Sequence, residues 1–161
     1  MTASLQILDF ESGLAADFDR INREWITGMF FLEEVDEQVI SDPETHIIAP
    51  GGHIWFAQLP GKGIVGTCAL AKKADGVFEL TKMGVSASAR GHKVGEALLQ
   101  HVLAQAPSIA TRQLFLLTNS RCEAAIHLYE KNGFVHDADV LATYGHGYQR
   151  CDVAMRYAVA E

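Results

Sequence analysis

The spacing of apolar residues changes from strand-like to helical near the amino end of the chain. Residues 4–10, SLQILDF, predict a short strand. Residues 11–25 place apolar side chains three or four positions apart, which predicts an amphipathic helix buried through Leu14, Phe18, Ile21 and Trp25. A second helix is predicted over 32–41, ending before Pro43, with Leu32, Val35 and Val39 facing inward. Its acidic face is expected to be mostly solvated, or else to form part of a mouth that favours cationic substrates.

The middle of the chain has the pattern of consecutive strands. Strands are predicted over 53–59, 64–71 and 77–85, separated by the turn sequences PGKG and KKADG. Connections this short favour antiparallel hairpins.

The second half alternates helices and strands. A helix beginning near residue 91 and closed by Pro107 precedes a buried strand over 113–119. Ser120 and Glu123 form a capping-box pattern that predicts the start of the next helix, and Gly133 is placed to end it. Strands are predicted over 134–136 and 148–159, and the intervening segment 137–147 is expected to be an irregular loop that could overhang a site. This order predicts an α/β fold (mixed α+β), with one mixed sheet and helices on both faces.

Composition limits the kinds of partner. The chain has 161 residues, 48% of them hydrophobic, which favours a single domain over 1–161. A net charge of -7 argues against binding to nucleic acid or to an anionic membrane. The amino end resembles no leader or membrane segment, so a cytoplasmic location is expected. Three separated cysteines fit reduced thiols, and the histidines lack the spacing of a metal site, so no metal is expected.

One loop has the features of an anion site. RGHKVGEALL directly follows a predicted strand and opens a predicted helix, where free backbone N–H groups and the helix dipole attract phosphates. Its glycines, Gly91 and Gly95, fit neither the Walker loop nor the dinucleotide fingerprint. A capped helix start with a tight glycine turn is the alternative explanation.

Two segments together resemble a known family. ELTKMGVSASARGHKVGEALL, followed by LTNSRCEAAIHLYEKNGF, is similar to the GNAT superfamily of N-acetyltransferases, whose signature is Q/R-x-x-G-x-G/A between a strand and a helix and a later Asn…Tyr-Glu-Lys-x-Gly-Phe segment. The resemblance spans residues 77–134. It implies the GNAT fold, with a mostly antiparallel sheet of about seven strands.

The resemblance also implies acetyl-CoA as cosubstrate and a set of residues that bind it. The backbone at Met83, Gly84 and Val85 would pair with the pantetheine arm. The pyrophosphate would be held by the loop Arg90, Gly91, His92, Lys93, Val94, Gly95 and Glu96. Asn119 would contact the cofactor arm, Tyr129 would lie near the thioester sulfur, and Lys131 would approach the phosphates or remain solvated. Lys93 replaces a glycine of the signature, which is tolerable if its backbone is right-handed; its side chain is then expected to brush a phosphate or lie in solvent.

Acetyl transfer to an amine requires a base, an oxyanion donor and an acid. Glu79 occupies the position at which several family members have a catalytic glutamate, and strand alternation predicts that it shares a face with Thr81, Met83 and Val85. A buried paired carboxylate is the alternative role for Glu79. The N–H groups of 83–85 are candidate oxyanion donors, and Tyr129 is the candidate acid for the departing thiolate.

The expected function is therefore acetyl-CoA-dependent N-acetylation of a primary amine on a small or amino-acid-like molecule. Acetylation of a protein or peptide, and cofactor sensing without catalysis, are the alternatives. A homodimer is possible. Candidate residues lining the acceptor site are Trp25, Phe30, Tyr144 and His146.

Overall fold

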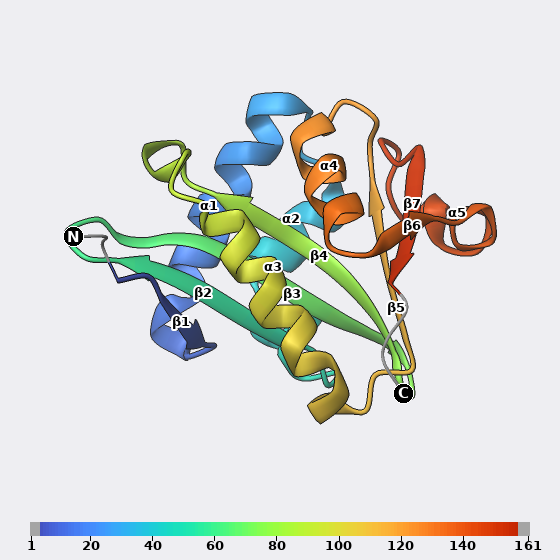
Figure 1. Ribbon diagram of the computed structural model, residues 1–161, viewed down its shortest axis with the longest axis horizontal. Coiled ribbons are helices and arrows are strands. Elements are labelled where there is room, and N and C mark those ends of the chain that lie inside the picture. Colours follow the sequence, from blue (N-terminus) through green and yellow to red (C-terminus); the bar gives the residue numbers. More distant parts are fainter. Residues whose placement is uncertain (1–3, 158–161) are drawn as a thin grey trace.

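A seven-stranded sheet organises the protein in a computed structural model that describes residues 4–157 (Figure 1). The strands lie in the order β1-β2-β3-β4-β5-β7-β6. Their bounds are β1 Gln6–Asp9, β2 His53–Leu59, β3 Gly63–Ala74, β4 Val77–Val85, β5 Gln113–Thr118, β6 Phe134–His136 and β7 Val153–Tyr157. All neighbouring pairs are antiparallel except β4 and β5, which run parallel. The predicted hairpins and mixed sheet are confirmed.

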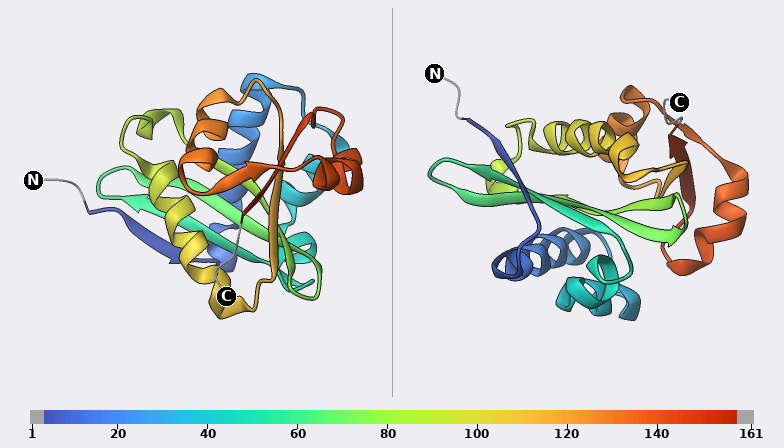
Figure 2. Two further views of the ribbon diagram at one scale, coloured as in Figure 1. Left: turned by 45° about the vertical axis from the view of Figure 1, so that its right-hand side comes forward. Right: turned by 90° about the horizontal axis from the view of Figure 1, so that it is seen from below.

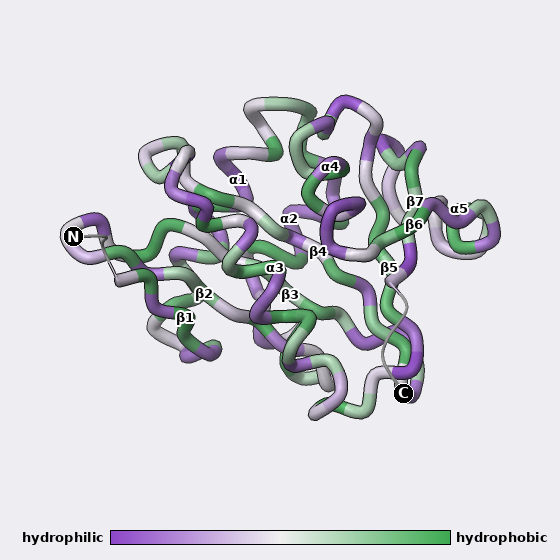
Figure 3. Tube along the Cα trace, in the orientation of Figure 1, coloured by the Kyte–Doolittle hydropathy of each residue, from purple (hydrophilic) through white to green (hydrophobic). Residues whose placement is uncertain are grey.

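Helices cover both faces of this sheet, as predicted (Figure 2). They are α1 Ala15–Met29, α2 Glu34–Ser41, α3 Val94–Gln105, α4 Glu123–Lys131 and α5 Ala138–Tyr144, with a π-turn at Glu44–Ile48 and 3-10 turns at Ser12–Leu14, Ala87–Ala89, Ala106–Ile109 and Gly145–Gly147. Helices α3 and α4 share one core with the sheet, whereas α1 and α2 pack on the opposite face. Hydrophobic residues follow the central strands, and hydrophilic ones gather at turns and outer helix faces (Figure 3). No helix among residues 4–157 combines the length and apolarity needed to cross a bilayer.

The acidic face of α2 differs from its prediction. Asp36 is fully buried and Glu33, just before the helix, is 8% exposed, whereas Glu34 and Glu37 are in solvent. Both buried carboxylates bond to Arg150, a residue far along the chain. Of the residues predicted to face inward, Leu32 and Val39 pack half-buried on the core and Val35 lines an outer groove, while Ile40 is the buried apolar residue of the helix. The apolar pattern does not show which acidic residues pair with a distant cation.

The predicted capping box at Ser120 is wrong. Helix α4 begins at Glu123 with Cys122 as its N-cap residue. The Asp152 carboxylate instead accepts bonds from the Ser120 amide at 2.8 Å and its hydroxyl at 3.0 Å. This long-range contact holds Ser120 in the connecting loop, so the helix starts later.

The segment 137–147 is largely helical rather than an irregular loop. Asp137 caps α5 through its side chain, which accepts bonds from the amides of Asp139 and Val140. Strand β7 begins only at Val153, so residues 148–152 leave the sheet. Residues 158–159 of the predicted last strand lie outside the described residues.

Strand β4 contains a bulge that alters its side-chain alternation. Lys82 has φ 53°, and the pairing register with β3 shifts in this region. Leu80, Met83 and Val85 therefore pack with the α3 and α4 core, whereas Glu79 and Thr81 face the other way. The predicted common face for Glu79, Thr81, Met83 and Val85 is wrong because the bulge inserts one residue between them.

Candidate active site

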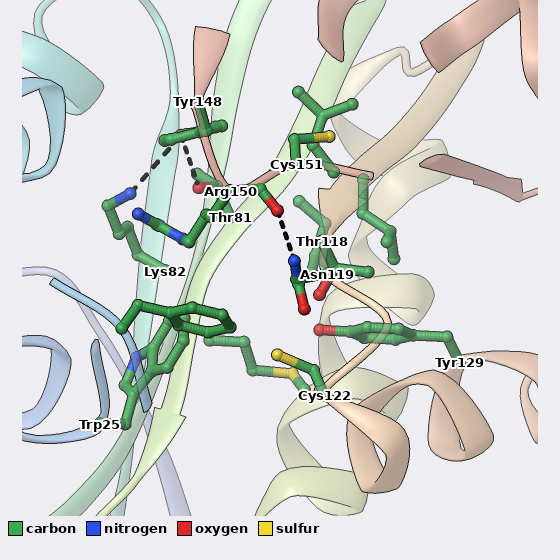
Figure 4. A pocket seen from close by; sticks show the side chains of 15 residues that line it. Trp25, Thr81, Lys82, Thr118, Asn119, Cys122, Tyr129, Tyr148, Arg150 and Cys151 are labelled. Carbon is green, nitrogen blue, oxygen red and sulfur yellow. Dashed lines mark hydrogen bonds between the residues drawn. The ribbon is translucent and has the colours of Figure 1, made fainter. Parts of the chain in front are cut away.

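A cavity opens where β4 and β5 separate. Residues Val77–Leu80 of β4 pair with Gln113–Leu116 of β5, and within residues 4–157 the two strands are not paired beyond these positions. Beyond that point the cavity is lined from β4 by Leu80–Met83, from β5 and its following loop by Leu116–Asn119, and by Trp25, Phe30, Cys122, Tyr129, Tyr148, Arg150 and Cys151 (Figure 4). The space between these residues measures about 540 Å³ when the open solvent at its mouth is included. This edge is the carboxyl end of two parallel strands, where ligand crevices form.

Tyr129 reaches the cavity from the middle of α4. Tyr129 as a whole is 7% exposed, and its ring packs against Phe134 at a centroid distance of 5.6 Å. Its hydroxyl points into the cavity (Figure 4). Burial raises the pKa of the Tyr129 hydroxyl, which therefore stays protonated. The cavity thus contains a fixed hydroxyl donor.

Asn119 lies at the end of β5 and ties two loops together. Its Nδ2 donates to the carbonyl oxygen of Arg150 at 2.7 Å, and its Oδ1 accepts from the Arg121 amide at 2.8 Å. The side chain borders the cavity while also fixing the backbone of the 148–152 segment.

The predicted phosphate loop forms an open groove next to the cavity. Val85 leads into it, and the loop contributes Arg90, Gly91, Lys93, Val94, Gly95 and Glu96, with Lys131 on the opposite side from α4. His92 does not line the groove, and its amide bonds to the Ala89 carbonyl at 3.3 Å. Lys131 pairs with Glu96 at 2.8 Å, which lowers the pKa of that carboxyl.

Lys93 does not have the right-handed backbone that was expected. It is the N-cap residue of α3 with φ 58° and ψ 28°, in the left-handed region that favours glycine. Its side chain is exposed. The signature calls for glycine here for a conformational reason, and lysine adopts the same conformation at an energetic cost.

Glu79 lies outside the Tyr129 cavity. It is 2% exposed, pairs with Lys73 at 3.3 Å and lines a separate cavity with Tyr144 and Tyr148. Burial raises the pKa of the Glu79 carboxyl, although the charges of Lys73 and Lys82 oppose this. Tyr148 lines both cavities, and its hydroxyl is 3.4 Å from Thr81 Oγ1 and 3.5 Å from Lys82 Nζ. Leu117 also lines both cavities, so Tyr148 and Leu117 together separate Glu79 from the Tyr129 cavity.

A buried ion network borders the end of the cavity opposite Tyr129. Asp36 accepts from Lys82 at 2.9 Å and from both Nη atoms of Arg150 at 2.6 and 2.8 Å, and Glu33 accepts from Arg150 at 3.1 Å. Burial would raise the pKa of Asp36, but the bond from Arg150 and the charge of Lys82 lower it to about 2. These residues were not singled out from the sequence, because the contacts join positions 46 and 114 residues apart and no local motif connects them.

Comparison with known proteins identifies the family to which this fold belongs. A sequence model described as an acetyltransferase (GNAT) domain matches residues 50–136. The chain belongs to the GNAT acetyltransferase family. It is therefore an acyltransferase, and the resemblance seen in its motifs is confirmed.

Individual relatives of this GNAT chain agree with the assignment. An amino-acid acetyltransferase of Ralstonia nicotianae is 36% identical over 83 residues, which cover 50% of this chain but only 18% of that protein. A GNAT-family acetyltransferase from Staphylococcus aureus Mu50 superimposes with a TM-score of 0.86 at 19% identity, covering 98% of this chain and 100% of the other. An N-acetylglutamate synthase from Neisseria gonorrhoeae, complexed with coenzyme A and N-acetyl-glutamate, gives 0.73 at 19% identity over 100% of this chain and 36% of that one. The latter two likenesses show the fold.

Only two of the four residues predicted to line the acceptor site line the cavity of this GNAT chain. Trp25 and Phe30 line it. Tyr144 instead stacks on Phe115 at 4.2 Å, and His146 lies along an outer groove. Gly84 faces α1, where a Cβ would collide with the Trp25 ring, so this glycine makes room for a cavity-lining side chain.

Proposed function

We propose that this GNAT enzyme transfers an acetyl group from acetyl-CoA directly to the primary amine of a small, amino-acid-like molecule. The observation that carries the proposal is that the phosphate-loop groove and the Tyr129 cavity lie along the same strand: Val85 of β4 lines the groove, and Met83, two residues earlier, lines the cavity. The Ralstonia relative is named an amino-acid acetyltransferase, which supports this class of acceptor. The three free cysteines support a reducing compartment such as the cytoplasm.

The groove and the strand edge fit coenzyme A. From Thr81 onward, β4 has no partner on its β5 side among the described residues, so its backbone is available to an extended ligand arm. The first turn of α3, at Val94–Glu96, directs backbone N–H groups into the groove, as a pyrophosphate requires. Lys93 adds positive charge at the rim of the groove, while Lys131 and Glu96 pair with each other and together carry no net charge. Acetyl-CoA would supply the acetyl group as a thioester.

The residues of the chain then have separate tasks. The amine must lose a proton before it attacks, and we assign that proton to Glu79 through the Tyr148 hydroxyl, which stands between the two cavities. A carboxyl with a raised pKa is suited to accept it. The protonated Tyr129 hydroxyl donates toward the sulfur as the carbon–sulfur bond breaks, and the Met83–Val85 amides are candidates to bind the carbonyl oxygen.

Replacing Tyr129 with phenylalanine tests this assignment. Tyr129→Phe is expected to lower turnover at least about a hundredfold, because it removes a donor for the leaving group, while the KM for acetyl-CoA stays within about twofold. Thiol release from acetyl-CoA with a panel of amines and amino acids measures both. Tyr157→Phe is the matched control, because Tyr157 packs on Phe134 at 5.3 Å without lining the cavity.

Three outcomes would change the proposal. Unchanged turnover in Tyr129→Phe would remove Tyr129 from the chemistry. Thermal stabilisation by acetyl-CoA without thiol release from any acceptor would identify a sensor rather than an enzyme acting on small amines. Release only with peptides would favour the protein-acetylating alternative.

A further inference from the structure

The acceptor end of the Tyr129 cavity is cationic in an otherwise acidic protein. Lys82 and Arg150 are the only charged residues that line this cavity in the described part of the chain. Their carboxylate partners, Asp36 and Glu33, lie behind them and do not line it. In Figure 4 the two cations and Tyr148 lie at one end of the cavity, and Cys122 and Tyr129 lie at the other. A ligand in this cavity therefore meets positive charge at one end and the Tyr129 hydroxyl at the other.

The Arg150 guanidinium retains an unused pair of donors. Of its five N–H groups, two on Nη1 bond to Glu33 and Asp36, and one on Nη2 bonds to Asp36. The Nε–H and the second Nη2–H have no acceptor among residues 4–157. These two lie on one edge of the planar group, with the spacing that binds a carboxylate bidentately.

The network holds this edge in a fixed orientation. The Arg150 guanidinium lies over the Tyr148 ring at 5.0 Å and the Phe30 ring at 5.7 Å, and Lys82 Nζ lies over the Tyr148 ring at 4.8 Å. Asn119 bonds to the Arg150 carbonyl at 2.7 Å, which links this end of the cavity to the end of β5. Because Asp36 and Glu33 already balance the two cations, the site needs no ligand to be stable, and the unused donors belong to a side chain that lines the cavity.

We propose that Arg150 and Lys82 bind the carboxylate of the acceptor, so that the acceptor is a primary amine carrying a carboxylate, as in an α-amino acid. This inference rests on the proposed function and narrows its substrate class. A polyamine or another purely cationic amine would meet like charge and no carboxylate in the cavity. An α-amino acid would place its carboxylate on the Arg150 edge, and its amine, on the neighbouring carbon, would lie between the Tyr148 hydroxyl and the Tyr129 end.

Matched acceptors test the inference directly. Amino acids and their carboxamides share an amine and a side chain, but only the acid has the carboxylate. The amine of the amide is less basic, so a larger fraction of it is neutral, and a preference for the acid cannot come from amine reactivity. For the wild type, kcat/KM is expected to be at least about tenfold higher for the acid, as loss of a charge-assisted pair implies.

Two arginine variants then locate the anchor. Arg150→Lys keeps the charge that Asp36 needs but removes the fork, so the preference for the acid is expected to fall at least about tenfold, with the KM for acetyl-CoA within about twofold. Arg121→Lys is the control, because Arg121 lies over the same Phe30 ring at 5.0 Å but does not line the cavity. Equal use of acid and amide by the wild type, or an equal loss of both in Arg150→Lys, would overturn the inference.

A binding measurement on the wild type separates this inference from the proposed function. In the presence of coenzyme A, an N-acetyl amino acid is expected to raise the melting temperature, and its carboxamide is not. If no acceptor releases thiol, the enzymatic proposal fails, but this difference still supports the carboxylate anchor. Equal stabilisation by both compounds, or by neither, sinks the anchor whether or not thiol is released.

Discussion

Lys93 adopts a backbone conformation that ordinarily belongs to glycine. For residues with a Cβ, the left-handed region costs about 1–2 kcal/mol, because the Cβ approaches the following carbonyl oxygen. The position begins α3 next to the phosphate groove, where the chain must turn sharply after Gly91, which itself has φ 88°. The sharp turn exposes the first amides of α3, and the lysine carries strain as a result.

Lys93→Gly is therefore expected to stabilise the fold. The free energy of unfolding should rise by up to about 1 kcal/mol, since relief of the left-handed strain exceeds the entropy that glycine adds to the unfolded chain. Urea unfolding measures this change. Lys93→Ala loses the same charge but keeps the Cβ, so it should show no gain. If alanine and glycine are equally stable, the backbone at 93 is not strained.

The buried ion network shows where residue-level reasoning from sequence ends. Motifs identified Tyr129, Asn119 and the phosphate loop, because each lies in a local pattern tied to a strand end or a helix start. Arg150 and Asp36 belong to no such pattern. Their pairing depends on the tertiary path of the chain, which brings residues 148–152 back beside α2.

At the scale of elements, the strands and helices of the core follow the apolar pattern closely, and the errors lie at a backbone bulge in β4, at the start of α4 and in the helical segment after β6. Strand β4 was predicted with its observed bounds, yet the bulge at Lys82 reversed the faces of Met83 and Val85 relative to Glu79. Alternation assumes regular pairing, so it cannot report an inserted residue. Ser120 is held away from its predicted cap position by hydrogen bonds to the distant Asp152, a contact that leaves no local sequence pattern.

Helix α5 offers a test of local capping. Asp137→Ala should lower the free energy of unfolding by about 1 kcal/mol, because it removes the acceptor for two amides at the helix start. Asp137→Asn keeps that acceptor and loses only the half-exposed ion pair with Arg156 at 3.1 Å, so it should cost less. Chemical unfolding of both variants gives the comparison. Equal losses would assign the effect to the ion pair rather than to the cap.

At the scale of the whole molecule, Asp36 connects three separate parts of the chain: α2, the β4 bulge and the 148–152 segment. Its pKa of about 2 lies below the ordinary 3.8, so the unfolded chain binds the proton more tightly than the folded one. The stabilisation from Asp36 is fully present when the pH is above the ordinary pKa of 3.8, and it is lost as the pH falls through the pKa of about 2 in the folded protein.

Acid titration should reveal this contribution. Between about pH 4 and pH 2, the wild type should lose about 2 kcal/mol of unfolding free energy through Asp36, and Asp36→Asn should lack this loss. Glu37→Gln, at an exposed position on the same helix, serves as the reference. If Asp36→Asn does not fold, an NMR titration of the Asp36 carboxyl in the wild type should have its midpoint near pH 2; a midpoint near 4 contradicts the assignment.

The short pairing between β4 and β5 divides the sheet into two parts. One part contains β1 to β4 and the other contains β5, β7 and β6. Only four residue pairs connect the two parts directly, from Val77–Gln113 to Leu80–Leu116. A rotation of one part of the sheet against the other about these four pairs would change the width of the cavity that both parts line. The hydrogen bonds from Arg150 to Asp36 and Glu33 cross the cavity at the end opposite Tyr129 and hold its two sides together. The same salt bridges thus set both the charge of the acceptor end and the stiffness of its walls.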